Sequence, residues 1–68
     1  MSINAFRVNQ DVTWTPDGSE GVVVRVLEGQ AVCIHWFNER LKDFWYSAWS
    51  GSLDRIEIVG FDEEREAA

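Results

Sequence analysis

Short runs of β-branched and aromatic residues, separated by turn-forming residues, constrain this chain more than any other feature of its sequence. The run Asp11–Thr15 alternates apolar with polar side chains, which is the period of a half-buried β-strand. Pro16, Asp17 and Gly18 follow it, and they favour a turn because proline fixes φ and glycine accepts a positive φ. No segment keeps a helical period for long, so the sequence predicts an all-β chain.

Four further runs have the same character. The strands predicted from them cover Gly21–Leu27, Ala31–Phe37, Phe44–Tyr46 and Ile56–Val59. Between the last two runs, Ser50 precedes a glycine and a serine, which favours one capped helical or 3₁₀ turn. Alternation within the runs predicts a core of Val12, Trp14, Val22, Val24, Val32, Ile34, Trp36, Leu53, Ile56 and Ile58.

The chain has 68 residues, enough for one small domain whose core is a single layer of side chains. Such a core leaves little room for a cofactor cavity of the usual ~300 Å³ or more. We expect an N-terminal arm over residues 1–9, anchored by Phe6 and Val8, a folded domain over residues 10–59, and a frayed acidic tail over residues 60–68.

Twelve acidic residues against six basic ones give the chain a net charge of −6. Nonspecific affinity for nucleic acid comes from clustered Lys and Arg side chains, so this charge argues against a nucleic-acid ligand. It favours a protein partner with a basic or neutral surface. The acidic tail could also attract a basic protein surface by mimicking nucleic acid.

The sequence shows no secretory signal and no apolar run approaching the ~18 residues that span a bilayer. Its single cysteine, Cys33, excludes an internal disulfide and a zinc site made of several cysteines. An unpaired thiol fits a reducing compartment better than an oxidising one. We therefore expect a cytoplasmic protein with no membrane contact, no cofactor and no metal.

Four motifs appear in a familiar order, namely Asp11-Val12-x-Trp14, Asp17-Gly18-x-x-Gly21-Val22-Val23-Val24, Val32-x-Ile34-x-Trp36 and Leu53-x-x-Ile56. This order, which spans Asn9 to Val59, resembles that of SH3-like small barrels, the group that includes the Tudor, KOW and chromo-barrel modules. The resemblance implies a single barrel of about five short antiparallel strands, with a short helical turn before the last strand. The motifs that bind proline-rich peptides are missing. Type II dihydrofolate reductases share the barrel plan, but their substrate-contacting segment has no match here.

Six of the nine aromatic residues lie between positions 36 and 49. Neighbours on a strand point to opposite faces, so both faces of the sheet carry apolar side chains and a single core hides only one. Either the arm or Phe61 covers the second face, or that face is a patch for a partner. We favour the patch and assign partner binding to Trp36, Phe37, Phe44, Trp45, Tyr46 and Trp49.

Two narrower hypotheses follow from the same cluster. Its rings could form a cage for a cation such as methyl-lysine, built from Trp36, Trp45, Tyr46 and Trp49. Alternatively, its outer members could drive self-association, because an apolar patch on the outer face favours contact with a second copy. We expect a weak or moderate homodimer through Val23, Leu27, Phe37 and one of Trp45 or Tyr46.

Cys33 and His35 lie two residues apart on one strand, so they share a face and could form a nucleophilic pair. The sequence shows no residue that would orient the imidazole, no oxyanion-hole motif and no metal or phosphate motif. We therefore predict no catalytic residue, and we interpret the chain as a non-enzymatic interaction module of bacterial or phage type. The alternatives are a small enzyme whose site forms at an oligomer interface, and an acidic inhibitor that mimics nucleic acid.

Overall fold

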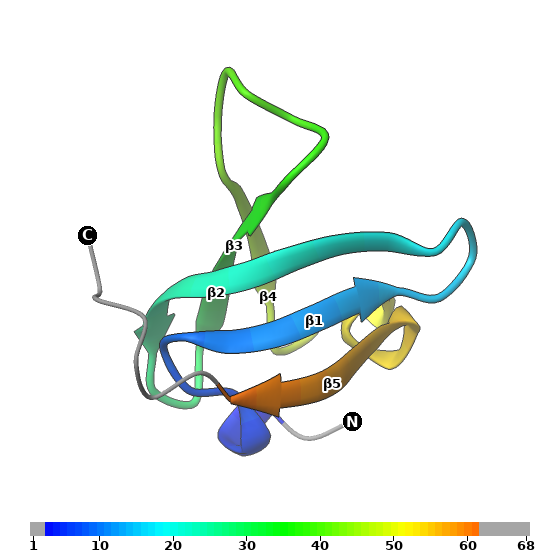
Figure 1. Cartoon of the computed structure of the whole chain (residues 1–68). Coiled ribbons are helices and arrows are strands. Elements are labelled where there is room, and N and C mark those ends of the chain that lie inside the picture. The colour runs from blue at the N-terminus through cyan, green and yellow to red at the C-terminus, as the bar shows by residue number, and fades with distance from the viewer. Residues whose placement is uncertain (1–2, 62–68) are drawn as a thin grey trace.

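The computed structural model describes residues 3–61 and consists of five strands and two short 3₁₀ turns (Figure 1). The strands are β1 (Gln10–Trp14), β2 (Ser19–Leu27), β3 (Ala31–Trp36), β4 (Phe44–Ser47) and β5 (Ile56–Phe61). The turn η1 (Ile3–Ala5) precedes β1, and η2 (Gly51–Arg55) lies between β4 and β5. The predicted all-β class and the helical turn before the last strand are confirmed.

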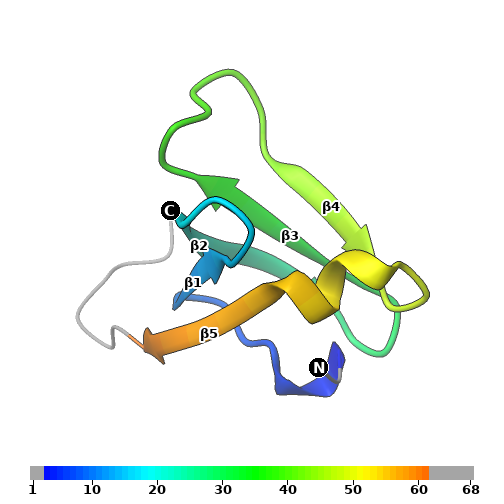
Figure 2. The same cartoon turned by 90° about the vertical axis from the view of Figure 1, so that its right-hand side faces the viewer.

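The strands form one antiparallel sheet in the order β4-β3-β2-β1-β5. Consecutive strands from β1 to β4 are neighbours, and β5 returns to pair with β1. The sheet bends, so that η2 and β5 lie across from β3 and β4 (Figure 2). No ladder joins β4 to β5 in the described part of the chain. The sheet is therefore not closed, and the barrel predicted from the sequence is not confirmed.

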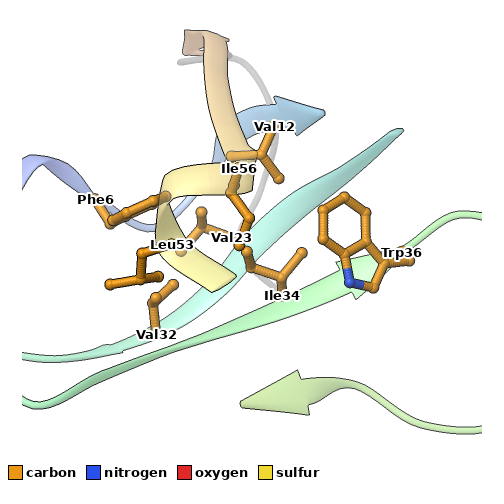
Figure 3. Close-up of a cluster of buried hydrophobic side chains, with 8 residues drawn as sticks. All are labelled: Phe6, Val12, Val23, Val32, Ile34, Trp36, Leu53 and Ile56. Carbon is orange, nitrogen blue, oxygen red and sulfur yellow. The ribbon is translucent and has the colours of Figure 1, made fainter. Parts of the chain in front are cut away.

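The core fills the space inside the bend (Figure 3). One of its residues, Leu53, comes from η2. This turn is capped at its start by the Ser50 hydroxyl, which accepts a hydrogen bond of 3.0 Å from the Ser52 backbone N–H. The Trp36 indole lies at one end of the cluster (Figure 3). Trp14 and Ile58 are partly buried and pack against the cluster. The buried members are Phe6, Val12, Val23, Val32, Ile34, Trp36, Leu53 and Ile56.

The prediction for the valines of β2 is right in part. Val22 is buried as predicted, although it stands across from His35 and outside the core cluster. Val23 is fully buried in the core, where the prediction had Val24, and Val24 is only half-buried. The inward series of β2 starts at Gly21, which stands across from Trp36. A Cβ atom at Gly21 would lie 2.7 Å from Cε3 of Trp36, so the indole occupies the space that a side chain would take. Gly21 and Val23 therefore share the inner face.

A bulge at Val24 resets the alternation of β2. The register with β3 shifts between Val23 and Arg25, which leaves Val24 without a partner residue. Beyond the bulge, Val26 pairs with Val32 of the core, and Leu27 is half exposed on the outer face. A strict alternation of inward and outward side chains along the strand predicts neither the bulge at Val24 nor the facing of Val26 and Leu27 beyond it.

The arm preceding β1 is packed against the sheet at Phe6, which is buried in the core as one of the two predicted anchors. At the other end, β5 continues to Phe61, two residues beyond the predicted limit at Val59. The rest of the predicted acidic tail, residues 62–68, lies outside the described residues. Within residues 3–61, no helix has the length and apolar character needed to cross a membrane.

Candidate partner-binding site

An open cavity of about 240 Å³ lies where the β1–β2 turn meets the β3–β4 loop and β4. Its walls are the rings of Trp14, Trp36, Phe44 and Tyr46, and we call it the aromatic pocket. The remaining lining residues are Asp17, Ser19, Asn38 and Glu39. Ligand sites for drug-sized molecules usually have ~300–1,000 Å³, so this volume fits a single side chain better than a metabolite.

Three of the rings hold one another in place. Trp14 stacks on Tyr46 with ring centroids 6.1 Å apart, and Trp36 meets both rings edge-on at 6.2 and 6.4 Å. The Trp36 Nε1–H donates a hydrogen bond of 2.8 Å to the Tyr46 hydroxyl. Edge-on and offset pairs of this kind are favourable beyond the area that they bury. The pocket wall is therefore preorganised before any ligand arrives.

Two carboxylates add negative charge to this wall. The Asp17 carboxylate accepts a hydrogen bond of 2.9 Å from the Ser19 backbone N–H, and this bond holds the pKa of Asp17 below its ordinary value. Glu39 lines the pocket from the opposite segment and accepts a hydrogen bond from the Leu41 backbone N–H at 3.2 Å. No lysine or arginine lines the pocket among the described residues.

Local sequence explains why these groups converge. Gly18 has a φ of 77°, a left-handed conformation that favours glycine, and its N–H donates to the Trp14 carbonyl at 2.8 Å. The resulting tight turn brings Asp17 to the end of β1. Across the pocket, the Asn38 Nδ2 donates to the Ser19 hydroxyl at 3.3 Å and ties the β3–β4 loop to the turn.

An ammonium group of the chain already packs on one ring of this site. The Lys42 Nζ atom lies 5.1 Å from the centroid of the Phe44 ring, within the range of a cation–π interaction. Phe44 is also part of the pocket wall. Lys42 itself does not line the pocket, so this contact shows only that the Phe44 ring accepts a cation.

The six aromatic residues assigned to partner binding do not form one surface. Three of them, Trp36, Phe44 and Tyr46, line the aromatic pocket. Trp45 points to the other side of the sheet, across from Cys33, and is half exposed. Phe37 is half exposed at the start of the β3–β4 loop, and Trp49 is 82% exposed between β4 and η2.

The hypothetical cage of four rings is likewise divided, since only Trp36 and Tyr46 of its members line the pocket. Trp14 was predicted as a core residue, and no binding role was predicted for Asp17 or Glu39. Trp14 stands two residues before the Pro16–Gly18 turn. An aromatic residue beside such a turn is the sequence feature that could have indicated a binding role for Trp14. Nothing in the sequence showed that the β3–β4 loop would face this turn.

Cys33 and His35 share the outer face of the sheet, as expected from their spacing. The structure adds Asp43, whose Oδ1 lies 2.9 Å from the Nδ1 of His35. This orienting carboxylate was not predicted from the sequence. No hydrogen bond joins the Cys33 thiol to His35. Burial raises the pKa of the thiol, and the nearby Asp43 carboxylate adds to the rise, so the thiolate needed of a nucleophile is disfavoured.

Within residues 3–61, no group of three or more His, Cys, Asp or Glu side chains is placed to hold a metal ion. The chain matches no known family model, no characterised protein and no solved structure. The aromatic pocket combines packed rings with two carboxylates in one cavity.

Proposed function

We propose that this protein is a small interaction module with an SH3-like plan, and that it accepts a cationic side chain of a protein partner in the aromatic pocket. The observation that carries the proposal is the joining of packed rings with the carboxylates of Asp17 and Glu39 in one cavity. A cation is attracted both by ring faces and by opposite charge. No enzymatic step is needed for this role.

The charge of the whole chain supports the same kind of partner. A net charge of −6 raises the rate of encounter with a basic surface and slows encounter with an acidic one. The partner is thus expected to present lysine or arginine side chains at its contact surface. Such a module would act in the cytoplasm, where the unpaired Cys33 stays reduced.

The test uses a short synthetic peptide with a central lysine, compared with the same peptide carrying norleucine at that position. Norleucine keeps the aliphatic stem and removes the ammonium group. Isothermal titration should show binding of the lysine peptide at least about fivefold tighter, the equivalent of ~1 kcal/mol from cation–π and charge interactions. Equal affinities for the two peptides would overturn the proposal.

Two variants separate the contribution of the rings from that of the charge. Asp17→Asn keeps an oxygen that can accept from the Ser19 N–H but removes the negative charge, so affinity should fall and its dependence on salt should weaken. Trp14→Leu keeps an apolar side chain and removes a ring from the wall. If only Asp17→Asn weakens binding, the protein binds its partner by charge alone. That result would favour the alternative in which this protein is an acidic inhibitor that mimics nucleic acid.

A further inference from the structure

The strand β4 is an unprotected edge of the sheet. The sheet order places β4 and β5 at the two edges. Proteins commonly protect an edge with a charge, a proline or a bulge, and β5 follows this rule, with Glu57 in the strand and a register shift against β1. The β4 residues Phe44–Ser47 include no charge and no proline, and they pair with β3 without a shift.

The backbone groups that β4 leaves open follow from its register. The Ala48 N–H donates to the Gln30 carbonyl at 2.7 Å, and hydrogen-bonded positions alternate along an antiparallel pair. Phe44 and Tyr46 therefore bond to β3, whereas the N–H and C=O groups of Trp45 and Ser47 point away from the sheet. Of these four groups, the Ser47 carbonyl accepts from the Ser50 N–H. The other three groups, which are the N–H and C=O of Trp45 and the N–H of Ser47, face the open edge.

The side chains of β4 divide between two environments. Phe44 and Tyr46 lie on the inner face and form part of the aromatic pocket. Trp45 lies on the outer face, half exposed, beside a groove lined mainly by apolar side chains. The other lining residues of this groove are Val8, Val24, Arg25, Val26 and Leu27. A strand added next to β4 would place alternate side chains beside these two environments, because its residues also point to opposite faces.

We propose that the partner binds as an extended segment that adds to the free edge of β4, with basic and apolar side chains in alternation. Resting on the proposed function, this inference puts a basic side chain beside Phe44 and Tyr46, near Asp17 and Glu39, and apolar side chains beside Trp45. Backbone hydrogen bonds to an exposed edge give affinity in this mode of recognition, and the alternate side chains give specificity.

Charge decides between this occupant and a second copy of the chain. Two copies would each bring a net charge of −6 to the contact, and the resulting repulsion opposes pairing of one β4 edge with another. A basic segment meets the same field with attraction and complements the two carboxylates of the pocket. The edge strand itself carries no charge that would repel either occupant.

The first test measures hydrogen exchange of the β4 amides by NMR, with and without a short synthetic peptide in which lysine alternates with valine. The Trp45 and Ser47 amides should become protected, by tenfold or more in exchange rate, when the peptide is bound. The Phe44 and Tyr46 amides already bond to β3 and serve as internal controls. Absence of added protection at Trp45 and Ser47 would overturn the inference.

The second test removes one donor from the edge. Ser47→Pro deletes an N–H that points away from the sheet, a position where proline is tolerated, and Ser47→Ala is the matched control that keeps this N–H. A lost hydrogen bond of average strength should weaken binding of the lysine–valine peptide by about three- to tenfold in the proline variant only. Equal binding by the two variants, at equal thermal stability, contradicts strand addition.

The outcomes distinguish this inference from the proposed function. If the lysine peptide still binds better than its norleucine analogue while the β4 amides stay unprotected, the pocket stands and strand addition is wrong. If the wild-type protein alone shows concentration-dependent protection of Trp45 and Ser47, a second copy occupies the edge and the inference is overturned. If neither peptide binds at all, both proposals are rejected.

Discussion

Gly21 illustrates how a single residue without a side chain positions a ring of the pocket. A Cβ atom there would lie 2.6 Å from the His35 carbonyl oxygen and 2.7 Å from the Trp36 indole, closer than van der Waals contact allows. We predict that Gly21→Ala destabilises the fold by roughly 1–3 kcal/mol, the usual range for overpacking. Urea denaturation measures the difference. Gly51→Ala is the control, because no atom lies within 4 Å of the added methyl group.

The Asp17 carboxyl gives a prediction about pH. The Ser19 N–H bonds to the charged form and lowers the pKa of Asp17, so the folded protein keeps this charge at a lower pH than an unfolded chain would. The stabilisation is present above the unfolded pKa and is lost as the pH falls through the folded one. An NMR titration of the Asp17 carboxyl carbon should give a midpoint below 3.8, and a midpoint above that value would contradict the assignment.

Cys33 gives a prediction about reactivity. Cys33 is 4% exposed and stands directly across from Trp45, and burial raises the pKa of its thiol. We expect the wild-type protein to react with a disulfide reagent at pH 8 at least about tenfold more slowly than a free thiol of ordinary pKa near 8.5. Trp45→Ala should accelerate the reaction by uncovering the sulfur. An unchanged rate in that variant would show that Trp45 does not shield Cys33.

At the scale of the secondary-structure elements, the facing of the β2 valines gives a prediction about stability. Val23→Ala should cost roughly 2 kcal/mol, because Val23 is completely buried in the core. Val24→Ala should cost well under half of that, because Val24 sits at the bulge and is only half-buried. Denaturation midpoints of the two variants provide the comparison. The opposite order would restore the assignment of Val24 to the core.

Most elements could be predicted from local sequence, whereas the inner face of one could not. The five strands and η2 follow from runs that alternate, from turn residues and from the Ser50 cap, all of which act within a few residues. The inner face of β2 instead depends on Trp36, fifteen positions along the chain from Gly21. Three consecutive valines carry no alternation of their own, so the face to which each one points is set by pairing with the partner strand.

At the scale of the whole molecule, salt separates the two kinds of association. The predicted homodimer surface is wrong at Val23, which is fully buried, whereas Leu27, Phe37 and Trp45 are half exposed. Repulsion between chains of net charge −6 opposes a homodimer, so any weak self-association through the exposed residues should strengthen as salt screens that repulsion. Binding of the lysine–valine peptide should weaken over the same range, because salt screens an attraction. Sedimentation and titration at about 0.05 and 0.5 M salt measure the two trends. A peptide affinity that rises with salt would contradict the charge-based choice of partner.

The class of the fold was present in the sequence. Alternation and turns are local properties, so the five strands could be predicted. Net charge is a sum that folding does not change, and the basic partner proposed from it stays a prediction. The site was decided by tertiary structure. Trp14 and Asp17 meet Glu39 and Tyr46 only because the sheet bends and the Asn38 contact joins two loops distant in sequence. Contacts of that range depend on the packing of the whole sheet, which no local pattern encodes.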